Sequence, residues 1–71
     1  MSRSFAILLK EAREKTPDPE RPGKTLTQER LAVVLGVDLG TIRHYEQGRR
    51  LPLNVIRKEI FRLFPFLTTT E

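Results

Sequence analysis

Apolar residues recur at helical spacing along most of the chain, beginning close to the N-terminus. Phe5, Leu8, Leu9 and Ala12 stand at i, i+3, i+4 and i+7, which places them on one face of a helix. The pattern predicts a first helix over residues 4–15, and either Ser4 or Ser2 can cap it.

The next segment, TPDPERPGK, interrupts this periodicity with three prolines and one glycine. These residues exclude a regular helix and predict a loop over residues 16–25. We interpret the loop first as a solvated connection. The alternative is an extended arm that touches phosphates through Arg21 and Lys24.

Two short helices follow, separated by a glycine. Thr27 is the expected N-cap of a helix over 28–35, whose inward face carries Leu31, Ala32 and Leu35. Gly36 stands where a left-handed residue is needed to end that helix.

Asp38 is the expected N-cap of the third helix, which we place from Leu39 to about Gln47. Ile42 and Tyr45 lie three residues apart and point to the core, and Gly48 ends the helix.

A fourth helix is predicted to open at Pro52, an early position that proline favours. Its apolar stripe comprises Leu53, Ile56, Ile60, Leu63 and Phe64, and Pro65 ends it. No stretch alternates with the period of a strand. The fold class is therefore expected to be all-α, with four or five short helices in one domain over residues 1–67 and a flexible tail over 68–71.

The composition of the chain indicates the kind of ligand that this helical domain binds. The chain has 71 residues, a net charge of +4 and no cysteine, and nine of its 13 basic residues are arginine. A small domain with a pI near 10.1 has the charge expected of a nucleic-acid binder. The N-terminal apolar run is too short for a secretion signal, which favours a cytoplasmic protein with no membrane segment.

The residues from Leu26 to Pro52 carry a pattern of high specificity, L-T-Q-E-x-L-A-x-x-L-G-V-x-x-x-T-I-x-x-Y-E-x-G-x-R-x-P. It resembles the helix-turn-helix of the phage lambda repressor and Cro family, also called the xenobiotic-response-element family. The resemblance is close over these 27 residues and looser over the flanking helices. It implies a lambda repressor-like fold in which one helix lies in the DNA major groove.

The resemblance also implies roles for individual residues. Base-reading positions of the family correspond here to Leu39, Gly40, Arg43 and His44. Leu39 and Gly40 depart from the polar residues common in relatives, so direct readout would fall on Arg43 and His44. Phosphate-contacting candidates are Thr27, Gln28, Thr41, Gln47, Arg49 and Arg50. An arginine of the first helix commonly pairs with a glutamate of the third, which corresponds to Arg13 and Glu46.

Two further features depart from the family, namely a longer loop after the first helix and a short C-terminal segment. The apolar residues Phe61, Phe66 and Leu67 are candidates for a two-fold interface, or they fold back onto the domain's own core.

We predict a DNA-binding transcription regulator of phage or prokaryotic type, a repressor that binds an inverted repeat of double-stranded DNA as a homodimer. The alternative is a protein-interaction module or an antitoxin built on the same scaffold. No enzyme activity, cofactor or metal is expected, since the chain has one histidine, no cysteine and no glycine-rich phosphate loop.

Overall fold

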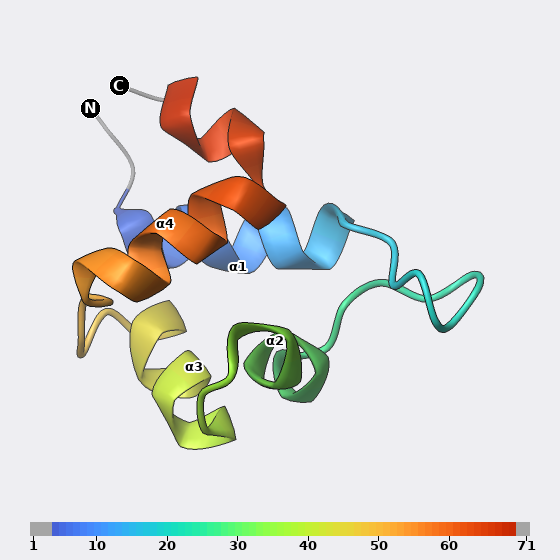
Figure 1. Cartoon of the computed structure of the whole chain (residues 1–71), viewed down its shortest axis with the longest axis horizontal. Helices are drawn as coiled ribbons and strands as arrows, with labels where there is room; N and C mark the ends of the chain where they lie inside the picture. The colour runs from blue at the N-terminus through green and yellow to red at the C-terminus, as the bar shows by residue number, and fades with distance from the viewer. Residues whose placement is uncertain (1–3, 70–71) are drawn as a thin grey trace.

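The protein is an all-helical bundle in a computed structural model that describes residues 4–69 (Figure 1). The elements are α1 (Phe5–Lys15), α2 (Gln28–Leu35), α3 (Leu39–Glu46), α4 (Asn54–Leu63) and a short 3-10 helix, η1 (Pro65–Thr69). The described residues form no strand, only one isolated bridge between Pro17 and Thr25. The predicted fold class is confirmed, and the fifth helix is the 3-10 turn η1.

The helix ends show why the central pattern predicts structure so well. Ser4 Oγ accepts the Ile7 N–H at 3.4 Å at the start of α1, and Thr27 Oγ1 accepts the Arg30 N–H at 3.0 Å at the start of α2. Gly36 ends α2 at φ +72°, where side chains are disfavoured. The alternative cap Ser2 lies outside the described residues.

The third helix differs in detail from the sequence-based prediction. Asp38 occupies the N-cap position in an extended conformation, but its side chain makes no capping hydrogen bond. The helix ends at Glu46, and Gln47 is its C-cap rather than its last residue. Asp38 therefore acts here through its backbone, since its carbonyl accepts the N–H groups of Thr41 and Ile42.

The core forms where α3 packs against both α1 and α2, with α4 and η1 closing the other side. The largest fully buried side chains come from four helices and the segment after α4: Leu9, Leu31, Ile42, Ile60 and Phe64. Burying such side chains contributes about 1.5–3 kcal/mol each relative to exposure. The position of α3 is therefore fixed from two sides.

The fourth helix starts two residues later than predicted, at Asn54. Pro52 is buried in the connection before it, and Leu53 is extended, so the proline belongs to the turn and not to the helix. The predicted apolar stripe is wrong at two positions, because Leu53 is 77% exposed and Leu63 is 37% exposed. The stripe is confirmed at Ile60 and Phe64, which are fully buried, and Ile56 is half-buried.

The C-terminal aromatic residues mostly pack within the same chain. Phe61 meets the ring of Phe5 edge-on at 6.5 Å between centroids, and the Arg57 guanidinium lies over both rings. Leu67 is buried, whereas Phe66 is 50% exposed. Of the residues expected to form a flexible tail, 68 and 69 belong to η1, and residues 70–71 lie outside the described part.

The loop between α1 and α2 is an ordered hairpin that projects from the bundle (Figure 1). The Asp18 N–H donates to the Lys24 carbonyl at 2.8 Å, and the Leu26 N–H donates to the Thr16 carbonyl at 3.0 Å. Asp18 is only 2% exposed. The segment is therefore more than an irregular solvated connection.

Candidate nucleic-acid interface

The helices α2 and α3 and the turn between them form one rigid unit. The Val37 N–H donates to the Ala32 carbonyl at 3.0 Å, which closes the turn after Gly36. Ala32 and Ile42 are both buried between the helices. The small Ala32 side chain lets α3 cross close to α2, as a helix-turn-helix requires.

A buried carboxylate joins this unit to α1. Arg13 Nε donates to Glu46 Oε2 at 2.7 Å, and Arg13 Nη2 donates to Glu46 Oε1 at 3.1 Å. Gln28 Nε2 donates to the same Oε1 at 3.0 Å, and Arg13 Nη1 donates to the Leu26 carbonyl at 2.9 Å. The Glu46 side chain is 3% exposed. The sequence-predicted pair is thus a bidentate contact in which one carboxylate links three helices.

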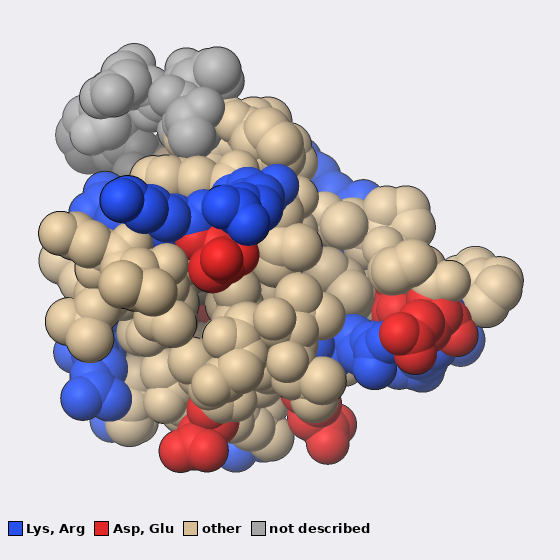
Figure 2. All heavy atoms as spheres, in the orientation of Figure 1, with Lys and Arg blue, Asp and Glu red and all other residues tan. Residues whose placement is uncertain are grey.

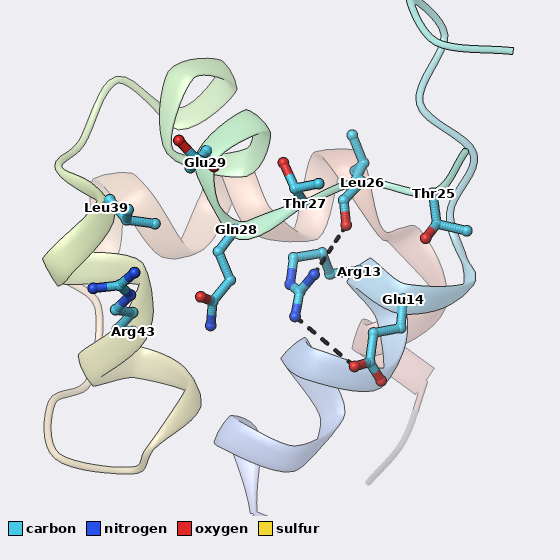
Figure 3. A pocket seen from close by; sticks show the side chains of 9 residues that line it. All are labelled: Arg13, Glu14, Thr25, Leu26, Thr27, Gln28, Glu29, Leu39 and Arg43. Atoms are coloured by element: carbon cyan, nitrogen blue, oxygen red, sulfur yellow. Dashed lines mark hydrogen bonds and ion pairs between the residues drawn. The ribbon is translucent and has the colours of Figure 1, made fainter. Parts of the chain in front are cut away.

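Next to this network lies an open pocket of about 420 Å³ (Figure 3). It brings together Thr27 and Gln28 from the start of α2 with Leu39 and Arg43 from α3, all four of them predicted site residues. Its other walls are Arg13, Glu14, Thr25, Leu26 and Glu29. Figure 3 shows Gln28 reaching into the space between Arg43 and Arg13.

The charges around the pocket are mixed. Arg13 is engaged by Glu46, and the carboxylates of Glu14 and Glu29 stand at two edges. Arg43 is exposed, and no ion pair among residues 4–69 involves it. An anion is therefore favoured on the Arg43 side of the pocket and disfavoured at the two acidic edges.

The remaining α3 candidates lie outside the pocket walls. Gly40 and His44 are exposed, and Thr41 is half-buried. No heavy atom of the described residues beyond its own helix backbone lies within 4 Å of the place that a Gly40 Cβ would take. The Gly40 backbone is regular helix, so the fold itself does not require glycine there.

Basic and polar candidates also follow α3 in the chain. Gln47 is exposed at the helix end, and Gly48 at φ +76° turns the chain so that the Arg49 N–H donates to the His44 carbonyl at 2.9 Å. Arg49 and Arg50 are both exposed. Arg21 and Lys24 are exposed on the hairpin, apart from this group.

Sequence reasoning missed several residues at or near this surface. Glu14 lines the pocket from α1, and nothing in its sequence context indicated that position. Thr25 directly precedes the recognised pattern and Leu26 is its first residue, so their position in the sequence was a usable signal for both as wall residues. Beyond the pocket, three apolar residues expose 70–77% of their surface, namely Leu51 and Leu53 in the connection to α4 and Val55 in the first turn of α4.

Comparison with known families agrees with this architecture. A family model described as a helix-turn-helix domain matches residues 4–59, which include α1 to α3 and part of α4. No curated protein and no solved structure matched the chain. None of the helices within residues 4–69 is long and apolar enough to cross a membrane. The chain therefore belongs to the helix-turn-helix domain family.

Proposed function

We propose that the protein is a sequence-specific regulator that binds double-stranded DNA, with α3 in the major groove. The observation that carries this proposal is the rigid attachment of α3 to α1 and α2 together with an outer surface of exposed Gly40, Arg43 and His44. A helix held in this way can present its N-terminal half to base edges, while α2 crosses the DNA backbone.

Each base-facing residue has a distinct chemical role in this proposal. The Arg43 guanidinium pairs with guanine O6 and N7, a contact worth roughly 1–3 kcal/mol of discrimination. His44 donates to a guanine or to a phosphate, and Leu39 contacts a thymine methyl group. Gly40 leaves open space in which the α3 backbone approaches the groove.

Phosphate contacts come from both ends of the helix-turn-helix. At the start of α2, Gln28 uses one amide hydrogen for Glu46 and keeps the second for a phosphate. The α2 N-terminus adds a partial positive charge beside it. The further proposed contacts are Thr27, Thr41, Gln47, Arg49 and Arg50. These contacts fix register and carry no sequence information.

We further propose a homodimer that represses transcription from an inverted-repeat operator on the nucleoid, in the cytoplasm. Two half-sites about 34 Å apart supply the affinity that one small domain lacks. Two of the interface residues proposed from the sequence are less suitable in the structure, because Leu67 is buried and Phe61 packs on Phe5 within the protomer. Phe66 stays half exposed, and Leu51, Leu53 and Val55 offer a larger apolar surface.

The second candidate function is a protein-interaction module, which includes an antitoxin. Two observations favour it, namely the uncharged Leu39–Gly40 pair at the start of α3 and the exposed apolar residues of the connection to α4. A protein partner would cover such an apolar surface. DNA affinity would then be weak and independent of α3.

The test is a selection of bound duplexes from a random-sequence library, followed by nuclease protection of the selected site. Protein with Arg43→Ala and His44→Ala serves as the comparison, since both side chains are exposed and their loss spares the core. Selection of an inverted repeat whose protection is lost in the variant supports the proposal. Folded wild-type protein that selects no duplex at low salt contradicts it and favours a protein partner.

A further inference from the structure

The hairpin over residues 16–25 is held in place by one arginine of α2. Arg30 Nε lies 3.6 Å from Asp18 Oδ1, and Arg30 Nη2 pairs with Glu20 Oε2. Asp18 Oδ1 also accepts the Glu20 N–H at 3.0 Å, while the Asp18 side chain is fully buried. A loop that only bridged two helices would not need a buried carboxylate, whose removal from water costs free energy.

The same contacts determine which charged side chains of the hairpin are paired and which are not. Arg30 draws both carboxylates back toward α2, whereas Arg21 and Lys24 are exposed and take part in no ion pair among residues 4–69. Figure 2 shows side chains of both signs gathered on the projecting hairpin. The hairpin therefore keeps two cations available to a ligand, although the segment also contains two acids.

The base of the hairpin belongs to the surface that we propose for DNA. Thr25 ends the returning segment of the hairpin and lines the same pocket as Gln28 and Arg43. Arg21 lies four positions after Pro17 at the base, so the backbone of the hairpin reaches at most about 13 Å beyond the bundle at the rise of an extended chain. With this reach, the hairpin extends the proposed DNA-binding surface beyond the N-terminus of α2, which is where we expect the backbone of the duplex.

We propose that residues 16–25 form a fixed arm whose Arg21 and Lys24 hold duplex phosphates flanking the major groove that α3 enters, with Arg30 as the positioning residue. This inference rests on the proposed function, because it names additional contacts of the same DNA complex. The contacts are electrostatic and independent of base sequence. Arg30 acts only through the conformation of the arm.

The first experiment measures fluorescence anisotropy of a labelled mixed-sequence 30-bp duplex between 50 and 200 mM salt. Arg21→Gln with Lys24→Gln removes two phosphate contacts, so the slope of log K against log salt should fall in magnitude by about 1.8. Binding at 0.1 M salt should weaken by roughly 10- to 60-fold. The matched control is Lys58→Gln with Arg62→Gln, which removes the same charge from exposed positions of α4 outside the pocket walls.

The outcomes separate the arm from the proposed function. An affinity and slope that change equally in the arm variant and the α4 control overturn the arm, because net charge alone then explains the effect. Wild-type protein that binds DNA while the arm variant keeps its affinity overturns the arm and leaves the function standing. Wild-type protein that binds no duplex overturns the proposed function itself.

The second experiment tests the positioning role with a variant for which simple electrostatics and a fixed arm predict opposite changes in DNA affinity. Asp18→Ala raises the net charge by one and leaves Arg30 with Glu20 as its remaining acidic partner, so simple electrostatics predicts tighter binding to the duplex. A fixed arm predicts weaker binding, by about the loss seen in the Arg21 and Lys24 variant, because the released hairpin no longer presents its cations. Circular dichroism at the assay temperature verifies that the helices are intact. Binding of the folded variant that equals or exceeds wild type overturns the positioning role.

Discussion

Gly40 and Gly36 offer a matched pair of substitutions that separates backbone conformation from packing. An added Cβ meets no neighbour within 4 Å at either position among the described residues. Gly40 has helical backbone in the first turn of α3, whereas Gly36 sits at φ +72° after α2. The two glycines thus differ in backbone conformation and not in available space.

The expected effects are opposite in sign. Gly40→Ala should stabilise the domain by up to about 1 kcal/mol, because alanine favours a helix over glycine by that amount. Gly36→Ala should destabilise it by about 1 kcal/mol, because the left-handed conformation is strained for any residue with a Cβ. For a domain of this size, 1 kcal/mol corresponds to a Tm shift of about 4–8 °C.

The assay is thermal unfolding followed by circular dichroism at one protein concentration without DNA. A Tm that falls in Gly40→Ala would refute the reasoning, because it would mean that the Gly40 site is neither open nor helical. The affinity of the same variant for DNA is measured in parallel to test the functional role of Gly40. If the α3 backbone approaches DNA closely at Gly40, the stabilised variant should bind its selected duplex less tightly than wild type.

Four further substitutions test the packing of the domain in urea unfolding. Glu46→Ala should cost about 3–5 kcal/mol, because it leaves the buried Arg13 without its bidentate partner; a cost under 1 kcal/mol would contradict the network. Ile60→Ala should lower the free energy of unfolding by about 2–5 kcal/mol, because the side chain is fully buried. Leu53→Gln should change it by no more than about 0.5 kcal/mol, because that side chain is 77% exposed. Equal losses in the two variants would show that Leu53 is buried, as the sequence-based stripe predicted. Leu67→Ala should lower stability independently of protein concentration if its burial is within one protomer, and a concentration-dependent loss would instead place it in a dimer interface.

Local signals made the centre of the fold predictable. The boundaries of α2 follow from Thr27 as an N-cap and Gly36 as a left-handed terminator, which are short-range effects of individual residues. The buried face of α3 follows from Ile42 and Tyr45 at helical spacing. Sequence reasoning could therefore place the helix-turn-helix before any coordinates.

The errors arose where distant contacts decide the local structure. Pro52 favours the start of a helix by itself, but here its ring is buried in the connection and the helix begins at Asn54. The hairpin depends on an ion pair between Asp18 and Arg30, which belongs to another element. The prolines of the loop predicted an irregular segment and gave no sign of this ordered conformation. The mixed charge of the pocket likewise depends on Glu14, which only tertiary packing brings into the same pocket as Arg43.

The central claim is that α3 reads DNA bases, and one equilibrium measurement tests it most directly. The affinity of wild-type protein and of Arg43→Gln would be compared on the selected duplex and on a scrambled duplex of equal composition. Our account predicts that wild type prefers the selected duplex and that Arg43→Gln loses roughly 5- to 150-fold of that preference, as expected for one bidentate guanine contact worth about 1–3 kcal/mol. Equal affinity of wild type for both duplexes, or a preference unchanged by Arg43→Gln and by the corresponding change at His44, would contradict it.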